Sequence, residues 1–316
     1  MPLTLRTRIL LWFDQLSHTQ PLHTLDPIAA RQAINRQARL ADRLIAYPPA
    51  PASHYTDTMI PGPDGYEVPL RIYRPLDGEG HPVILYLHGG GFTVGGLETH
   101  GRLCWRIAQE TGAVVVFVRY RLAPEHPFPA GLEDCQAALV WTRAHIGPYG
   151  GAPDKLIVMG DSAGGNLAAA LCLACRDRGI PGPLAQVLIY PVTDMRCDAP
   201  SHEELGTGYW LTSQTVRWYH RQYIRRQADL DHPYASVLRA SDLRDLPPAL
   251  VITAAYDPLR DEGEAFALRL QEAGVPVTAQ RYPGVIHAFF NMQRWLPEAR
   301  AALAQVSTFI RQVVHT

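Results

Sequence analysis

One serine of this sequence stands in surroundings that are typical of a nucleophile. Ser162 is the central residue of GDSAG, residues 160–164, which fits the pattern G-x-S-x-G. A short apolar stretch, residues 156–159, precedes the motif, and a stretch rich in Ala and Leu, residues 166–178, follows it. A tight turn from a strand into a helix holds the serine hydroxyl above a sheet in a strained conformation. The pattern therefore predicts Ser162 as the nucleophile of an acyl-transfer reaction.

A glycine-rich loop is the second feature with chemical meaning. His88 is followed by three glycines and Phe92, directly after the apolar residues 83–87. Consecutive glycines leave backbone N–H groups unobstructed, as an oxyanion hole requires. The loop does not fit the phosphate-binding pattern G-x-x-x-x-G-K. We expect the loop to face the reacting carbonyl, and His88, which precedes Ser162, to anchor the loop by hydrogen bonding.

An acid and a base are expected downstream of the serine, in that order. Asp257 follows the apolar residues 249–254, and a carboxylate at the carboxyl end of a strand faces the site crevice of such folds. The only histidines after Asp257 in the sequence are His287 and His315, and His315 is the penultimate residue. His287 is therefore predicted as the base by near elimination, with Asp257 holding its imidazole in one tautomer.

Two other carboxylates remain open as the acid. Asp194 also follows an apolar stretch, residues 186–190, and could reach the same space. Asp261 lies one helical turn beyond Asp257 and could cap a helix or form a local ion pair. We favour Asp257, which could also cap the helix that follows it.

The elements that must position these residues alternate between strands and helices. The predicted strands are short, continuously apolar and rich in β-branched residues, which is typical of a sheet buried on both faces. They are residues 66–73, 83–87, 113–118, 156–159, 186–190, 249–254 and 277–282, and the helices between them are 99–111, 129–145, 163–178, 258–273 and 296–314. This order predicts an α/β fold with a mostly parallel central sheet and helices on both faces.

Two segments do not follow this alternation. Residues 1–50 are expected to be helical, with Asp26 as a helix cap before Pro27. Residues 194–240 interrupt the alternation and contain a helix-like run, residues 212–224. Long insertions in compact domains are often lids. We expect both segments to form a helical cap over a catalytic core made of residues 51–193 and 241–316.

Composition excludes several classes of protein. The chain has 316 residues and a formal net charge of −1, which argues against a nucleic-acid or anionic-membrane binder. No stretch approaches the roughly 20 apolar residues of a membrane span. Five cysteines are too few and odd in number for a disulfide scaffold. We expect a cytoplasmic protein with a small-molecule partner.

Nothing in the sequence predicts a metal or a cofactor. The pair Cys172 and Cys175 lies inside a predicted helix, where packing is the better interpretation. No H-E-x-x-H motif occurs. Five further histidines are scattered along the chain and are expected at the surface: His18, His23, His54, His100 and His202.

Together, these motifs resemble those of the hormone-sensitive lipase family of α/β-hydrolases, a group with many bacterial carboxylesterases. The resemblance extends from about residue 60 to the C-terminus and rests on HGGGF (88–92), YRLAPE (120–125), GDSAGGN (160–166), DPLRDE (257–262) and HAF (287–289).

The resemblance implies an α/β-hydrolase fold with a helical cap, Ser162 as nucleophile, Asp257 as acid and His287 as base. It also implies an oxyanion hole formed by three backbone N–H groups, those of Gly90, Gly91 and Ala163. No cofactor is implied. Many members of the family are homodimers, so a homodimer is an expectation as well.

The substrate is expected to be a short- to medium-chain or aromatic carboxylic ester. Four aromatic residues are predicted near the pocket, Phe92, Tyr190, Tyr209 and Trp210, although they could instead pack a cap against the core. The same triad could serve an amidase, a lactonase or a carbamate hydrolase. A binding protein on this fold is disfavoured, because relatives that only bind ligands have lost the histidine that is present here as His287.

Overall fold

The computed structural model describes residues 2–16, 20–44, 47–75 and 78–315. Within them one sheet has the strand order β1-β2-β4-β3-β5-β6-β7-β8. β1 (Tyr55–Pro61) and β2 (Glu67–Tyr73) pair antiparallel, and β2 pairs antiparallel with β4 (Val114–Val118). The remaining pairs are parallel and join β4, β3 (His81–Leu87), β5 (Gly151–Asp161), β6 (Gln186–Ile189), β7 (Ala249–Tyr256) and β8 (Val277–Ile286).

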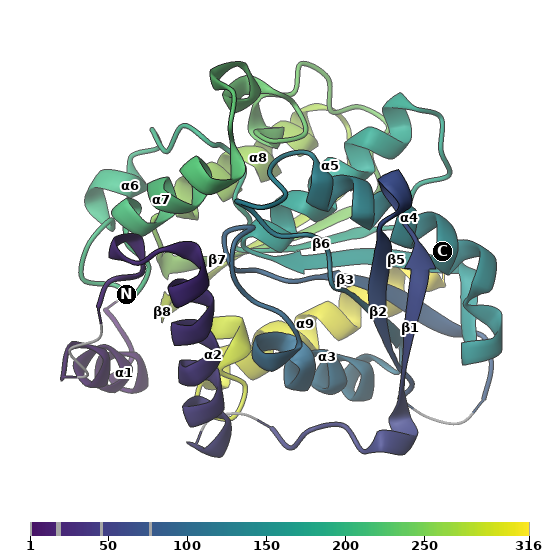
Figure 1. Cartoon of the computed structure of the whole chain (residues 1–316), viewed down its shortest axis with the longest axis horizontal. Helices are drawn as coiled ribbons and strands as arrows, with labels where there is room; N and C mark the ends of the chain where they lie inside the picture. Colours follow the sequence, from purple (N-terminus) through teal and green to yellow (C-terminus); the bar gives the residue numbers. More distant parts are fainter. Residues whose placement is uncertain (1, 17–19, 45–46, 76–77, 316) are drawn as a thin grey trace.

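Helices cover both faces of this sheet. On one face lie α4 (Ala130–His145), α5 (Ala163–Asp177) and α8 (Arg260–Glu272), and on the other lie α3 (Leu97–Thr111) and α9 (Pro297–Val314). In Figure 1, α5 and α8 are seen above the sheet and α3 and α9 below it.

Alternate residues of a strand enter opposite cores. Leu85 of β3 packs with the α4 and α5 side, whereas its neighbours Ile84 and Tyr86 pack with the α3 and α9 side. A strand buried on both faces has no polar face, which explains the unbroken apolar runs of the sequence. The predicted α/β-hydrolase fold and its mostly parallel sheet are confirmed.

All seven predicted strands and all five predicted core helices are present, with shifted ends. One strand was missed. β1 is an edge strand in which only Ile60 is fully buried, and its sequence includes the polar run Thr56–Thr58. An edge strand pairs on one side only, and its pattern is therefore weaker than that of a central strand.

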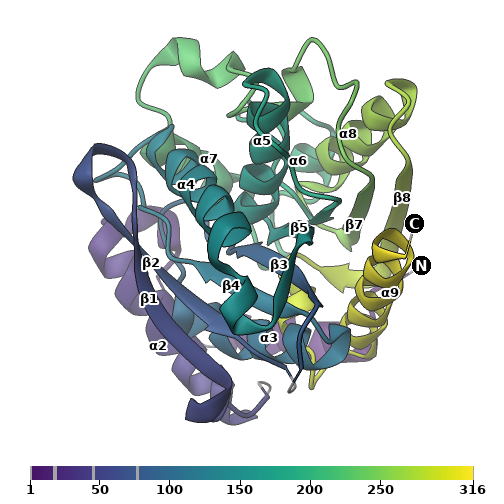
Figure 2. The same ribbon diagram turned by 90° about the vertical axis from the view of Figure 1, so that its right-hand side faces the viewer.

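Two segments lie over the carboxyl ends of the strands. One contains α1 (Leu5–Leu16), the 3₁₀ helix η1 (Leu22–Thr24) and α2 (Pro27–Leu44), and the other contains α6 (Ser201–Glu204) and α7 (Ser213–Tyr223). Figure 2 shows the fold turned by 90°, with α2 behind β1 and β2, and Figure 1 shows that α2 lies well apart from these two strands. Asp26 caps α2 as predicted, since its Oδ1 accepts the N–H groups of Ile28 and Ala29 at 3.0 Å each.

Other short 3₁₀ helices join these elements: η2 (Ala52–His54), η3 (Pro63–Gly65), η4 (Gly147–Tyr149), η5 (Gln227–Asp231), η6 (Val237–Arg239) and η7 (Phe289–Asn291). All five cysteines are buried free thiols. Among the helices that the structure describes, none has both the length and the apolar composition needed to cross a membrane.

Candidate active site

Ser162 stands at a sharp turn between β5 and α5. Its backbone has φ 55° and ψ −120°, a conformation that non-glycine residues rarely adopt. The turn depends on the two glycines of the motif. A Cβ on Gly160 would lie 2.2 Å from the carbonyl oxygen of Gly164, and a Cβ on Gly164 would lie 1.9 Å from that of Leu87. No other residue type fits at either position without moving the backbone.

A chain of hydrogen bonds joins the serine to a histidine and an acid. Ser162 Oγ lies 3.0 Å from His287 Nε2, and His287 Nδ1 lies 2.7 Å from Asp257 Oδ2. All three side chains are buried, with Asp257 fully so. The other carboxylate oxygen of Asp257 accepts the N–H of Leu259 at 2.9 Å, which fixes the orientation of the carboxylate. The three residues therefore have the geometry of a catalytic triad.

The two alternative acids lie elsewhere. Asp194 forms an ion pair with Arg239 at 2.6 Å, and Asp261 forms one with Arg260 at 2.6 Å. Neither carboxylate is hydrogen-bonded to His287. The structure thus brings Asp257, and not Asp194 or Asp261, to the histidine.

Three backbone N–H groups are free to bind an oxyanion. Within the described residues, those of Gly90, Gly91 and Ala163 have no hydrogen-bond acceptor. The N–H of Ala163 belongs to the first turn of α5, where the helix dipole favours negative charge. Gly91 has φ 57°, and a Cβ there would lie 2.1 Å from the ring of Tyr219. The loop can therefore approach α7 closely only with glycine at this position.

Comparison with known proteins agrees with this geometry. A family model described as an alpha/beta hydrolase fold matches residues 84–291, which include all of the residues discussed above. The chain belongs to the hormone-sensitive lipase family of α/β-hydrolases.

Relatives within the hormone-sensitive lipase family cover most of the chain. It is 43% identical to the carboxylic ester hydrolase LipN of Mycobacterium tuberculosis over 77% of this chain and 67% of that protein. It is 39% identical to the ethyl acetate hydrolase of Pseudomonas putida over 92% of each. The solved structure of a hyperthermophilic esterase from Pyrobaculum calidifontis, 41% identical, superposes over all of both chains with a TM-score of 0.93.

The glycine-rich loop of residues 88–92 is held by a buried carboxylate. Asp161 accepts hydrogen bonds from the N–H of Gly89 at 3.0 Å, from the hydroxyl of Tyr86 at 2.7 Å and from His100 Nε2 at 3.2 Å. Burial by itself raises the pKa of Asp161, but His100 and the other two donors outweigh it and lower that pKa below its ordinary value. Asp161 is therefore an ionised anchor directly beside Ser162.

His88 anchors the same loop from its other side, as predicted. Its Nδ1 donates to the carbonyl oxygen of Gly89 at 2.7 Å, and its ring stacks on Tyr120 at 4.4 Å. Burial lowers the pKa of His88 to about 3, so the ring is neutral. His88 therefore has a structural role in the loop and is not the base.

The expectation that the scattered histidines lie at the surface is wrong for two of them. His100 is buried against Asp161, and His202 is buried against Glu262, with Nε2 and Oε2 3.0 Å apart. Their partners are about sixty residues away in the chain, so no local pattern could reveal them. His23 and His54 are half-buried, and His18 lies outside the described residues.

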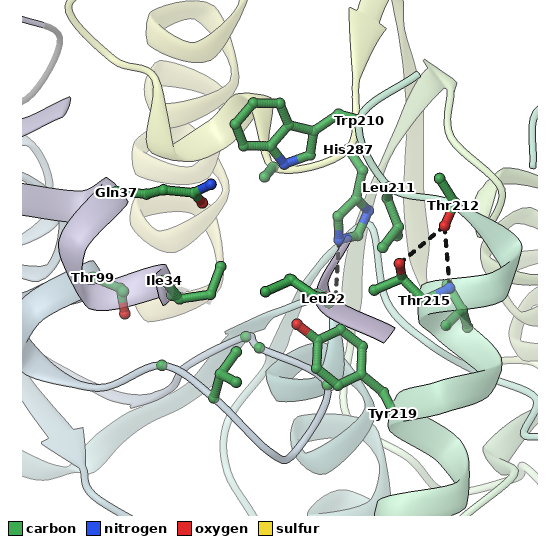
Figure 3. A pocket seen from close by; sticks show the side chains of 18 of the residues that line it. Leu22, Ile34, Gln37, Thr99, Trp210, Leu211, Thr212, Thr215, Tyr219 and His287 are labelled. Carbon is green, nitrogen blue, oxygen red and sulfur yellow. Dashed lines mark hydrogen bonds between the residues drawn. The ribbon is translucent and has the colours of Figure 1, made fainter. Parts of the chain in front are cut away.

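A cavity of about 500 Å³ is lined by Ser162 and His287, and Figure 3 shows it with His287 labelled. Side chains of the N-terminal segment, among them Ile34 and Gln37, line one side of it. Side chains of α7, among them Thr215 and Tyr219, line the opposite side, with His287 between them. In the part of the chain that is described, no three His, Cys, Asp or Glu side chains lie together so as to hold a metal ion.

The structure corrects the predicted aromatic lining. Trp210 lines the cavity and is 41% exposed, but Phe92, Tyr190 and Tyr209 are not among the lining residues. Phe92 stacks on Tyr223 with ring centroids 3.8 Å apart. Tyr190 packs against His287 at 4.5 Å, and Tyr209 against Tyr256 at 5.1 Å. These three rings pack against other aromatic side chains, which was the alternative that the sequence left open.

Proposed function

We propose that this protein is a serine carboxylesterase that hydrolyses short- to medium-chain or aromatic esters through an acyl-enzyme on Ser162. The observation that carries the proposal is the hydrogen-bonded chain Asp257–His287–Ser162 at the base of a cavity that also presents unpaired N–H groups. Free serine is a weak nucleophile and needs an adjacent base, which this arrangement supplies.

Acylation uses every member of this arrangement. His287 Nε2 takes the proton of Ser162 as Oγ attacks the ester carbonyl carbon, and the carbonyl oxygen becomes an oxyanion. The N–H groups of Gly90, Gly91 and Ala163 donate hydrogen bonds to it. The carboxylate of Asp257 stabilises the imidazolium that has formed. The tetrahedral intermediate then expels the alcohol, and His287 returns the proton to the leaving oxygen.

Deacylation repeats these steps with water. His287 takes a proton from a water molecule, whose oxygen attacks the acyl carbonyl, and the same three N–H groups bind the second oxyanion. Collapse of this intermediate releases the carboxylic acid and returns the proton to Ser162 Oγ. Each half-reaction thus restores the protonation state from which it began.

We propose that residues 1–50 and 194–240 form a cap over a core of residues 51–193 and 241–316. An apolar cluster supports this division, because it joins Ala30 of α2 to Trp218 and Tyr219 of α7 and attaches both segments to the core at Val94. Arg31 of α2 also donates to the carbonyl oxygen of Thr93 at 2.7 Å. A cap attached in this way would limit the length of the bound substrate, with Trp210 contacting the substrate from the second segment.

The names of the relatives agree with small esters as substrates, since one acts on ethyl acetate. The cavity of about 500 Å³ lies within the roughly 300–1,000 Å³ range of small-molecule sites. We propose that the enzyme works in the cytoplasm, because its five thiols are unpaired and a reducing compartment preserves them. A homodimer is proposed from the family alone, and light scattering of the purified chain tests it.

The test is hydrolysis of p-nitrophenyl esters from acetate to palmitate, with Ser162→Ala measured beside the wild type. We expect the highest kcat/KM on short chains and its loss in Ser162→Ala, with an unchanged circular dichroism spectrum. Hydrolysis that persists in Ser162→Ala, or no hydrolysis of any ester by the wild type, would overturn the proposal.

A further inference from the structure

One hydroxyl group of the cavity wall is unpaired. Tyr219 of α7 lines the cavity, and its hydroxyl has no hydrogen-bond partner within the described residues. The other hydroxyl-bearing side chains that the structure describes in this wall are hydrogen-bonded: Ser162 to His287, Thr99 to the carbonyl oxygen of Gly96, and Thr212 and Thr215 to each other. Tyr219 therefore brings a polar group to the cavity that the proposed reaction does not use.

The hydroxyl of Tyr219 is open to the cavity. Figure 3 shows its ring extending from α7 into the cavity, with the oxygen at the leading end on the side of Leu22. The hydroxyl of Tyr223, four residues further along the same helix, is also unpaired, but it is fully enclosed and does not line the cavity. The oxygen of Tyr219 is not among the enclosed unpaired atoms. A molecule bound in the cavity can therefore reach it.

The ring of Tyr219 is held in place beside the proposed oxyanion hole. A Cβ on Gly91 would lie 2.1 Å from Cγ of Tyr219, so the ring packs directly on the glycine-rich loop. Trp218 contacts the ring edge-on, with centroids 5.1 Å apart, and Ala30 and Val94 belong to the same apolar cluster. A side chain that is already held by its neighbours loses little conformational entropy when a ligand binds to it.

This hydroxyl is suited to donate a hydrogen bond. Burial raises the pKa of Tyr219, so the phenol keeps its proton at neutral pH. A phenolic hydroxyl can both donate and accept, and it is a better donor than an aliphatic alcohol because it is more acidic. Ether and carbonyl oxygens can only accept. A ligand with such an oxygen beside Tyr219 would satisfy a donor that is otherwise unpaired and largely removed from water.

We infer that the hydroxyl of Tyr219 donates a hydrogen bond to a substrate oxygen outside the scissile ester group, so that the enzyme prefers esters that carry a further ether or carbonyl oxygen. This inference rests on the proposed function and narrows its substrate class. The scissile group has other partners in that function, because backbone N–H groups bind its carbonyl oxygen and His287 protonates its leaving oxygen. The further oxygen could belong to the acyl or to the alcohol portion of the ester.

Two matched substrate pairs distinguish these sources, because within each pair one ether oxygen replaces one CH₂ group. On the acyl side, ethyl methoxyacetate is compared with ethyl butanoate. On the alcohol side, 2-methoxyethyl acetate is compared with butyl acetate. The readout is the ratio of kcat/KM for the ether to that for the alkyl ester, measured by acid release. The ether oxygen also changes the intrinsic reactivity of the ester, and comparing the same ratio between enzyme variants removes that effect.

Two substitutions on α7 form a matched set. Tyr219→Phe removes only the hydroxyl and keeps the ring that packs on Gly91. Tyr223→Phe removes the enclosed, unpaired hydroxyl and is the control. We expect Tyr219→Phe to lower the ratio in one pair by about fivefold, the scale of one lost hydrogen bond between neutral groups. Tyr223→Phe should leave both ratios at the wild-type value, and thermal melting checks that both variants are folded.

The outcomes are distinct from those that test the esterase itself. The inference is overturned if Tyr219→Phe leaves the ratio unchanged in both pairs, or lowers kcat/KM equally for the two members of each pair, while Ser162-dependent hydrolysis stands. It is also overturned if Tyr223→Phe changes a ratio as much as Tyr219→Phe does. Hydrolysis that survives in Ser162→Ala would instead overturn the proposed function.

Discussion

The carboxylate of Asp161 accepts the backbone N–H of Gly89 at 3.0 Å, across 72 residues of chain. The residue that follows each partner is one of the proposed catalytic residues: Ser162 follows Asp161, and Gly90 follows Gly89. This bond therefore sets the distance between the proposed nucleophile and the N–H groups proposed to bind the oxyanion. Preorganised donors contribute to catalysis only when that distance is correct.

Removing the carboxylate of Asp161 should displace the glycine-rich loop of residues 88–92. Asp161→Ala is expected to lower kcat at least about 100-fold, the scale of losing one oxyanion donor, with a smaller change in KM. Asp161→Asn keeps an oxygen for Gly89 and Tyr86 and should retain much more activity. Steady-state kinetics on p-nitrophenyl acetate measures both variants. Equal kcat in Asp161→Ala and the wild type would show that the loop holds its position without this anchor.

The three carboxylates that the sequence offered as the acid provide a matched series. Asp257→Asn should lower kcat by about 10⁴-fold, because an amide favours the wrong tautomer of His287. Asp194→Asn and Asp261→Asn should each keep most of the activity, since these carboxylates pair with Arg239 and Arg260. Kinetics on one short ester, with thermal melting as the folding control, tests the series. The assignment of Asp257 fails if Asp194→Asn is the variant that loses activity.

Two neighbouring aromatic residues test the proposed cap. Trp210 lines the cavity, whereas Tyr209 packs on Tyr256 outside it. Trp210→Ala should therefore enlarge the cavity and shift the preferred acyl chain to a longer one, and Tyr209→Ala should leave the preference unchanged. A p-nitrophenyl ester series gives the chain-length profile of each variant. An unshifted profile in Trp210→Ala would mean that this ring does not contact the substrate.

Two buried histidines should make the fold sensitive to acid. Burial lowers the pKa of His88 to about 3 and that of His220 to about 4, whereas the unfolded chain takes up these protons near pH 6.5. The unfolded state therefore binds more protons between these values, and stability is lost as the pH falls from about 6.5 towards 4. Each histidine contributes a slope of up to about 1.4 kcal/mol per pH unit.

Urea unfolding between pH 8 and pH 4.5 measures this slope. His220→Asn should give a shallower dependence than the wild type, because one of the two groups no longer titrates. His315→Asn, which changes an exposed residue near the C-terminus, is the control and should not alter it. Parallel curves for the wild type and His220→Asn would contradict the prediction.

Local patterns predicted every strand of the sheet except β1, the turn at Ser162 and the candidate acid and base. The reason is physical: strands such as β4 are buried on both faces, and close packing admits only glycine at Gly160 and Gly164. Both constraints leave a local trace in the sequence, a continuous apolar run in one case and a glycine at a fixed position of the motif in the other. The catalytic roles of Ser162, Asp257 and His287 remain predictions, which the geometry supports.

Contacts between distant residues could not be predicted in this way. The pairs His100–Asp161 and His202–Glu262 each join residues about sixty positions apart. The stacked rings of Phe92 and Tyr223 are even further apart in the sequence. A histidine or an aromatic ring has the same local sequence whether it is buried or exposed. Only the folded chain shows which partner it has, and for His220 that one ring nitrogen has none among the described residues.

The most direct test of the account is to label the proposed nucleophile. A fluorophosphonate reacts with an activated serine and forms a stable covalent adduct, and peptide mass spectrometry locates it. We predict one adduct per chain, on Ser162, and strongly slowed labelling in His287→Ala, which keeps the serine but lacks its base. An adduct on any other residue, or labelling of Ser162 at the wild-type rate in His287→Ala, would contradict the proposal that His287 activates Ser162 for attack on an ester.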